Sequence, residues 1–270
     1  MYADLDRPPL RAAEMTRAVV YDGSLWRSVE VVARTGSTNA DLAATARSGA
    51  PEGEVLVAEE QTGGRGRLDR RWVSPSRAGL TFSMLFRPPV PAARRGWLPL
   101  LAGVAVAGAV RSLGAVPARL KWPNDLLLGD AKVAGVLAEV VEDAVVIGVG
   151  LNVSTRRDEL PDGGTSLAVV GAECTDRDPL LRAILREVEV GYRRWCQHGG
   201  DAATCGLRAA YVELSDTLGR EVSVALPSGA RVAGRAEDID STGRLVLRVG
   251  SERNALAAGD VTHVRRSSRE

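Results

Sequence analysis

The residues best suited to chemistry begin with a glycine–arginine loop. Gly63-Gly64-Arg65-Gly66-Arg67 is followed by Arg70, Arg71 and Trp72, so four arginines and one aromatic ring fall within eight residues. Glycines let a backbone bend closely around a ligand, and guanidinium groups bind phosphates and carboxylates. The pattern predicts an anion-binding loop, although a solvated loop or a contact to single-stranded nucleic acid has a similar composition.

The only two lysines of the chain form a second group. The other 33 basic residues are all arginine, whereas Lys121 and Lys132 fall within one stretch of twelve residues. An ammonium is a compact point charge, and a tight anion pocket distinguishes it from the wide, planar guanidinium. The clustering indicates a pocket that needs the ammonium itself.

Each lysine stands in its own motif. Lys121-Trp122-Pro123-Asn124-Asp125 combines a cation, an amide and a carboxylate at a predicted turn, and these groups suit a polyphosphate with Mg²⁺. Lys132 opens an apolar strand that contains Gly135, where a ligand can approach the backbone. An ordinary Asn-Asp turn and a lysine extending to water would explain the same residues.

Two further motifs are less specific. Ser37-Thr38-Asn39 is typical of a helix N-cap, and its hydroxyls could also bind a polar ligand. Gly148-Val149-Gly150-Leu151-Asn152 begins like a dinucleotide-binding loop, but Val153 replaces the third glycine. The sequence has no Walker A spacing, so an ATP site would not be a P-loop.

The composition argues against several classes of protein. Three cysteines without a CxxC pair, and two histidines outside any ligand pattern, predict no disulfide framework, zinc site or histidine base. A net charge of +1 predicts no general attraction to DNA or to a membrane. No apolar run approaches about 18 residues and no signal peptide is recognisable, so we expect a cytoplasmic protein.

Hydrophobic periodicity predicts the elements that hold these motifs. Strands are expected at 25–34, 54–59, 80–86 and 144–153, and 119–141 should contain a strand and a hairpin turning at Gly129-Asp130. Helices are expected at 40–47, 96–113, 178–197 and 201–213. The helix at 96–113 is apolar on almost every side and should be buried.

The chain divides into three predicted segments. Residues 1–23 are expected to be an irregular lead-in, and 24–214 a mixed α/β domain. Residues 215–270 show short alternating strands between glycine-containing turns, which predicts a small β-barrel of about five strands.

Taken in order, the motifs resemble those of the biotin–protein ligase family. From Ser37 to Asn152 they are Ser-Thr-Asn, Gln61 before Gly-Arg-Gly-Arg, Trp72, Lys-Trp-Pro-Asn-Asp, Lys-x-x-Gly and Gly-x-Gly-x-Asn. The resemblance implies an α+β catalytic domain with a mixed sheet, of the biotin/lipoate ligase type, followed by a C-terminal SH3-like small β-barrel. Lipoate and octanoyl ligases share this fold and are the alternative, although they usually lack Lys-Trp-Pro-Asn-Asp beside such an arginine loop.

The family reaction has two steps. The carboxylate of biotin attacks the α-phosphate of MgATP to give biotinoyl-5′-AMP and pyrophosphate, and a carrier lysine then attacks the mixed anhydride to form a C–N bond. ATP and Mg²⁺ are the implied cofactors, with biotin as substrate. Because two anions must meet, the site mainly has to neutralise and align them.

The resemblance also assigns roles to residues. Lys132, Arg67 and Arg65 are expected to act in catalysis, with Lys132 bridging the carboxylate and the α-phosphate. The expected biotin-binding residues are Ser37, Thr38, Asn39, Gln61, Gly64, Arg65, Gly66, Arg67, Lys132 and Gly135. The expected ATP-binding residues are Arg67, Arg70, Trp72, Lys121, Asn124 and Asn152, and Asp125 is expected to bind Mg²⁺.

The implied partner is the biotin carboxyl carrier domain of an acyl-CoA carboxylase. Some family members also carry an N-terminal DNA-reading domain, but only 36 residues precede Ser37, so we expect no DNA binding. Membrane association is not expected either, and a homodimer is left open. A nucleic-acid-binding module and a non-catalytic biotin-binding protein are the rival interpretations.

Overall fold

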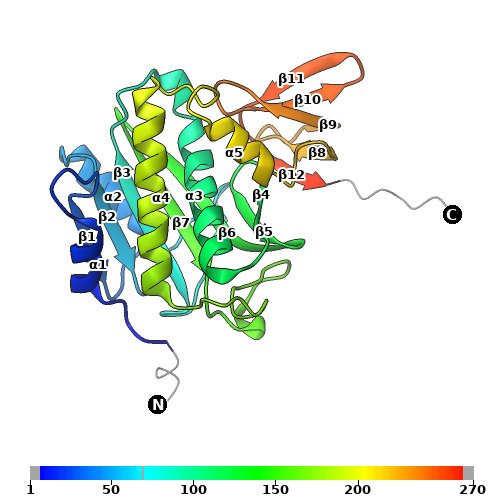
Figure 1. Cartoon of the computed structure of the whole chain (residues 1–270). Coiled ribbons are helices and arrows are strands. Elements are labelled where there is room, and N and C mark those ends of the chain that lie inside the picture. The colour runs from blue at the N-terminus through cyan, green and yellow to red at the C-terminus, as the bar shows by residue number, and fades with distance from the viewer. Residues whose placement is uncertain (1–6, 69, 264–270) are drawn as a thin grey trace.

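A seven-stranded mixed sheet forms the centre of the larger domain (Figure 1). The computed structural model describes residues 7–68 and 70–263. The strand order is β1-β2-β3-β7-β6-β5-β4, in which β1 and β2 are parallel and all other neighbours are antiparallel. The strands are β1 (Ser28–Val32), β2 (Glu54–Ala58), β3 (Gly79–Phe86), β4 (Arg119–Lys121), β5 (Asp125–Leu128), β6 (Ala131–Val141) and β7 (Ala144–Asn152).

Helices cover both faces of this sheet. They are α1 (Ala12–Val19), α2 (Thr38–Arg47), α3 (Trp97–Gly114), α4 (Arg177–Gln197) and α5 (Leu207–Leu214), with the 3-10 turns η1 (Ala92–Arg94) and η2 (Arg157–Glu159). Figure 1 shows α3 and α4 side by side across one face. Side chains alternate along β3, so Phe82 and Met84 join the core that includes α3 and α4, while Leu85 packs with Leu42 of α2. The strand is therefore buried on both faces.

The helix α3 is apolar because it lies in the core. With the turn before it, Ala92–Gly114 is long and apolar enough to cross a membrane, but 61% of its most apolar window is buried inside the protein. It contacts α4, α5 and the strands β4 to β7. The apolar composition of α3 is therefore that of a helix buried in the core.

The second domain is an antiparallel sheet of five strands in the order β11-β10-β9-β8-β12. They are β8 (Glu221–Ala225), β9 (Arg231–Ile239), β10 (Leu245–Val249), β11 (Glu252–Leu256) and β12 (Asp260–His263). The indole nitrogens of Trp97 and Trp122 donate to the carbonyls of Asp240 (3.1 Å) and Gly243 (3.3 Å). The turn between β9 and β10 is thus fixed against the larger domain.

Two local predictions were wrong. Residues 7–23 are not an irregular lead-in, because they contain α1, whose Met15 and Val19 are fully buried four residues apart; residues 1–6 lie outside the described part. The helix predicted from 201 begins only at Leu207. The carboxylate of Asp201 instead accepts from the backbone N–H groups of Ala203 and Thr204, which holds that segment in a turn.

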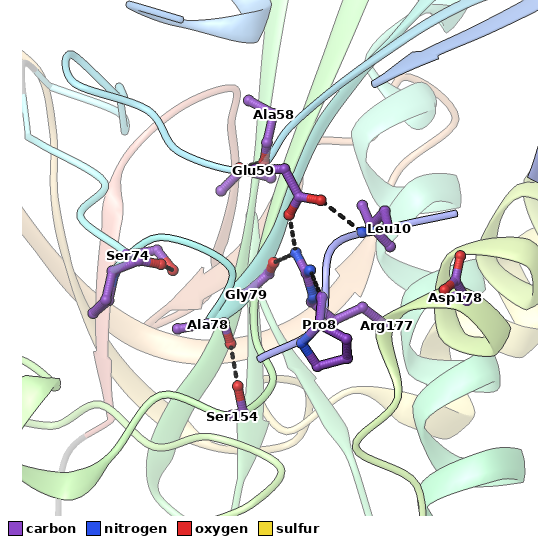
Figure 2. Close-up of polar contacts among 12 residues, drawn as sticks. Pro8, Leu10, Ala58, Glu59, Ser74, Ala78, Gly79, Ser154, Arg177 and Asp178 are labelled. Carbon is purple, nitrogen blue, oxygen red and sulfur yellow. Dashed lines mark hydrogen bonds and ion pairs between the residues drawn. The ribbon is translucent and has the colours of Figure 1, made fainter. Parts of the chain in front are cut away.

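A buried ion pair ties the N-terminal segment to the sheet (Figure 2). Arg177 donates from Nη1 to Glu59 Oε2 (2.6 Å) and from Nη2 to the carbonyl of Pro8 (2.5 Å). Glu59 Oε1 accepts from the N–H of Leu10 (2.6 Å), and the two charged side chains are only 6% and 8% exposed. Glu59 stands two residues before Gln61, so this contact also fixes the start of the arginine loop.

We expect Arg177→Ala to lower the free energy of unfolding by roughly 3–5 kcal/mol, because it leaves the buried carboxylate of Glu59 without its cation. Urea unfolding measures the change. The double variant Glu59→Gln/Arg177→Met should be less destabilised than Arg177→Ala alone. Equal stability of Arg177→Ala and the wild type would show that water replaces the guanidinium.

Candidate active site

One pocket gathers most of the predicted residues, although they come from four separate parts of the chain. Its walls are the start of α2, the arginine loop, the turn into β5, strands β3, β6 and β7, and the beginning of β12. The predicted residues that line it are Ser37, Thr38, Asn39, Gln61, Arg65, Gly66, Arg67, Arg70, Trp72, Asn124, Asp125, Lys132 and Gly135.

Three predicted residues do not line this pocket. Asn152 is buried and donates from Nδ2 to the carbonyl of Thr165 (3.0 Å), so it holds the loop after β7. Lys121 lines a separate small cavity behind the turn. Gly64 is needed inside the loop, because a Cβ there would lie 2.4 Å from the carbonyl oxygen of Trp72. The side chains of Asn152 and Lys121, and Gly64, thus lie outside the lining of this pocket, and their predicted ligand contacts stay predictions.

The arginine loop is a short hairpin. Trp72 N–H donates to Gly64 O (3.0 Å), Gly66 N–H to Arg70 O (2.7 Å) and Arg70 N–H to Arg67 O (3.2 Å). Asp69 lies outside the described residues. The hairpin places the side chains of Arg65, Arg67 and Trp72 along one pocket wall.

Arg67 is the best anchored of these arginines. Its Nη1 donates to Gly259 O (3.1 Å) and Asn124 Oδ1 (3.4 Å), and the side chain is 20% exposed. Burial lowers the pKa of the Arg67 guanidinium below its usual value, while the negative charges of Asp260 and Asp125 oppose that shift. An arginine this far from its titration range remains charged at neutral pH.

Lys132 lies between a carboxylate and an aromatic ring. Its Nζ is 2.5 Å from Asp125 Oδ1 and 5.9 Å from the centroid of the Trp72 ring. A Cβ on Gly135 would come within 3.2 Å of Nζ, so that glycine makes room for the ammonium. With 37% of the side chain exposed, Lys132 can exchange Asp125 for an anionic ligand.

The glycines of the Gly-x-Gly motif serve packing rather than a dinucleotide loop. A Cβ on Gly150 would lie 2.2 Å from Trp72 Cε2, and one on Gly148 would lie 2.1 Å from Asn39 Oδ1. Both glycines belong to β7, which pairs with β3 and β6. They let Trp72 and Asn39 lie directly against the sheet.

We therefore expect Gly150→Ala to displace Trp72 and lower the activity roughly tenfold or more, since small displacements of positioning groups are costly. The matched control is Gly108→Ala on α3, where an added Cβ meets nothing within 4 Å. Activity assays and thermal unfolding of both variants make the comparison. Normal activity of Gly150→Ala would show that the placement of Trp72 is not needed.

A neutral hydrogen-bonding network lies at the α2 end of the pocket. Gln61 Oε1 accepts from the N–H (2.8 Å) and the hydroxyl (3.0 Å) of Thr38. The hydroxyl of Ser83 lies 2.8 Å from Thr38 Oγ1 and 2.6 Å from Asn39 Oδ1. Ser83 was not predicted, although a serine within the apolar run 80–86 was a usable signal. This end suits a polar, uncharged group of a ligand.

The residues that line the pocket but were not assigned a ligand contact from the sequence are Arg71, Phe82, Val136, Leu137, Gly148, Val149, Gly150 and Asp260. Asp260 matters most, because it comes from the second domain and forms an ion pair with Arg70. Its Oδ1 is also 3.9 Å from Arg67 Nη1. Nothing in the sequence distinguished this aspartate from others in turns.

The lining carries five cationic side chains and two carboxylates, a surplus of three positive charges that favours an anionic ligand. Among the described residues no group of three or more His, Cys, Asp or Glu side chains could hold a metal ion. Asp125 could supply one ligand. That arrangement fits Mg²⁺ carried by a polyphosphate, since this ion usually binds one or two carboxylates together with phosphates and water.

A polar, uncharged end beside a cationic end, with no cysteine or histidine among the described lining residues, suits an enzyme that aligns anionic substrates by charge neutralisation. The family models agree with this class. "Biotin/lipoate A/B protein ligase family" matches residues 31–152, and "Biotin protein ligase C terminal domain" matches 217–264.

Individual proteins are similar over most of the chain. A biotin–[acetyl-CoA-carboxylase] ligase of Mycobacterium tuberculosis is 46% identical, covering 96% of this chain and 97% of that protein. The bifunctional ligase/repressor BirA of Escherichia coli is 35% identical over 72% of this chain and 61% of its own length. The structure of an Aquifex aeolicus biotin protein ligase with biotin and ATP superposes with a TM-score of 0.74 at 26% identity, covering 89% of this chain and all of that one.

The chain belongs to the biotin/lipoate A/B protein ligase family. The resemblance drawn from the ordered motifs is confirmed. So is the fold class, a mixed-sheet α+β domain followed by a small antiparallel domain of the kind found at the C-terminus of biotin protein ligases.

Proposed function

We propose that this chain forms biotinoyl-5′-AMP from biotin and ATP and transfers the biotin to a lysine of a carrier protein. One observation carries the proposal: the cationic cluster and the neutral hydrogen-bonding network share a single pocket. The ATP-dependent biotin ligase class expected from the motifs agrees with the names of the similar proteins and with their complexes.

In the first step a carboxylate oxygen of biotin forms a bond to the α-phosphorus, and the bond from that phosphorus to pyrophosphate breaks. We assign Lys132 the bridging of both anions after it leaves Asp125, with Arg65 and Arg67 closing from the hairpin; the partly exposed ion pair of Lys132 and its place in the pocket lining support this role. Mg²⁺ bound to the phosphates, with Asp125 as its protein ligand, would neutralise the leaving pyrophosphate.

The remaining lining residues orient the two substrates. Ser37, Thr38, Asn39 and Gln61 should bind the uncharged ureido end of biotin through the network described above, with Gly66 and Gly135 allowing close backbone approach. Trp72 should pack on the adenine, and Arg70 and Asn124 should contact the nucleotide phosphates. Gly64, Lys121 and Asn152 then support these groups from outside the pocket.

The deciding experiment is biotin-dependent exchange of pyrophosphate into ATP, followed by transfer of labelled biotin to a carrier domain. Pyrophosphate exchange without biotin transfer would support only the first step of the proposed reaction. Calorimetry with biotin against lipoate separates the biotin ligase from the lipoate ligase alternative. Binding of single-stranded nucleic acid that weakens steeply with salt and needs no ATP would favour the nucleic-acid module instead.

The proposed carrier is the biotin carboxyl carrier domain of an acyl-CoA carboxylase, and we propose a cytoplasmic location. Residues 24–214 and 215–270 are the proposed domains, of which 264–270 lie outside the described part. Between Arg7 and Gly36 the described residues form α1 and β1, with no DNA-reading helix pair among them.

A homodimer through β6 would explain an unpaired strand edge. β5 pairs with β6 only as far as Gly135, so Ala138–Val141 has no strand partner on that side within the described residues, and Val140 is 71% exposed. Light scattering with and without biotin plus ATP measures the mass. A monomer at all concentrations would exclude this interface.

A further inference from the structure

A second cavity adjoins the active-site pocket at the junction of the two domains. It has a volume of about 520 Å³ and shares Arg67, Asn124, Val136 and Leu137 with the first pocket. Its other walls are the start of α3, the Trp122-Pro123 turn, and residues of the second domain near β10 and β11. The two cavities therefore meet at Arg67 and Asn124.

The first pocket cannot also admit the second substrate. Once the adenylate fills it, the carrier amine must reach the acyl carbon from another direction. That carbon is the former carboxylate carbon, joined through one oxygen to the α-phosphate, so the roles proposed above put it close to Lys132 and Arg67. The adjoining cavity reaches Arg67, and its size is within the roughly 300–1,000 Å³ typical of small-molecule pockets.

The walls of this cavity suit a neutral amine. They are largely apolar, with Pro99, Leu100 and Trp122 on the side of the larger domain. No carboxylate is among the lining residues within the described chain, and the only charged ones are Arg67 and Arg244. Asp240, the carboxylate paired with Arg244, lies outside the lining.

Building on the function proposed above, we propose that this cavity is the access channel for the lysine-bearing turn of the carrier domain, and that its walls keep the lysine in its uncharged, nucleophilic form. An apolar wall and nearby cations both disfavour an ammonium. The channel thus replaces a general base, in agreement with a site that has no histidine or cysteine.

The chemical step needs no additional reactant. The amine nitrogen forms a bond to the acyl carbon, and the bond between that carbon and the phosphate oxygen breaks. AMP leaves with the electron pair of that bond. The proton lost by nitrogen passes to water or to the released phosphate.

Narrowing the channel should separate the two half-reactions. Ala93→Trp and Ala257→Trp narrow it from opposite domains, and neither residue lines the first pocket. We expect pyrophosphate exchange within about twofold of wild type, but kcat/KM for the carrier domain reduced roughly 10- to 100-fold. Capture of biotin from the adenylate by hydroxylamine, which needs no docking, should be unchanged. The control is Ala233→Trp, an exposed position on β9 outside both cavities.

A charge placed in the channel tests the nucleophile directly. Ala93→Asp should favour the protonated lysine, so the pH profile of transfer from preformed biotinoyl-5′-AMP should shift upward by roughly one unit, whereas Ala93→Asn should not shift it. Normal biotin transfer in both tryptophan variants would overturn the proposal that this cavity is the access channel. Loss of exchange in those variants would also overturn it, and would assign the cavity to the triphosphate. A wild-type protein without exchange would instead refute the proposed function itself.

Discussion

Replacing Lys132 with alanine is expected to reduce adenylate formation by roughly 10²- to 10³-fold. Its ammonium is the only lysine charge in the pocket lining, and it is held in an ion pair that an incoming anion can displace. Lys132→Arg should recover little, because a planar guanidinium is wider than the ammonium that lies against Asp125, Gly135 and Trp72.

Pyrophosphate exchange measures this effect, and thermal unfolding checks that the fold persists. The natural comparison is Lys121→Ala, because the second lysine lies outside the pocket lining and its removal should cost far less. Equal losses in the two variants, or near-normal exchange in Lys132→Ala, would refute the assigned role.

Removal of Arg67 should have the second largest effect. Arg67→Ala is expected to lower the rate of adenylate formation by roughly 10²-fold, since it removes a fixed charge and also frees Asn124 and the Gly259 carbonyl. Arg67→Lys should restore only a small part, because one ammonium cannot follow the planar geometry of those contacts. Arg65→Ala should cost less, as that side chain is exposed and has no comparable anchor.

A comparison of Arg67→Ala with Asp260→Asn separates the effect of the positive charge of Arg67 from the effect of how the arginine side chains are positioned. Asp260 is negatively charged and cannot stabilise an anion itself, but it forms an ion pair with Arg70 and lies near Arg67, so it can hold these arginines in position. Its replacement should therefore raise KM for ATP more than it lowers kcat. A kcat loss as large as that of Arg67→Ala would mean that Asp260 takes part in the chemistry.

The sequence by itself determined the chemistry and most of the elements. The arginine loop, the two lysines and the Ser-Thr-Asn cap depend on local spacing, and hydrophobic periodicity is likewise local, so both can be recognised without knowing what packs against them. The succession of helices and strands in the larger domain and the five short strands of the second domain followed from that periodicity, whereas the mixed sheet was implied by the family resemblance.

Only the tertiary structure decided which polar residues gather at the pocket. Asn152 and Lys121 were predicted contacts that lie outside the pocket, whereas Ser83 and Asp260 were not predicted and contribute to its network and its charges. The direction of a side chain depends on strand register and on the neighbours across the sheet, and Asp260 reaches the arginine hairpin only because the two domains are docked through Trp97 and Trp122. Contacts between residues nearly two hundred positions apart, such as Arg67 and Gly259, cannot be predicted from the spacing of neighbouring residues.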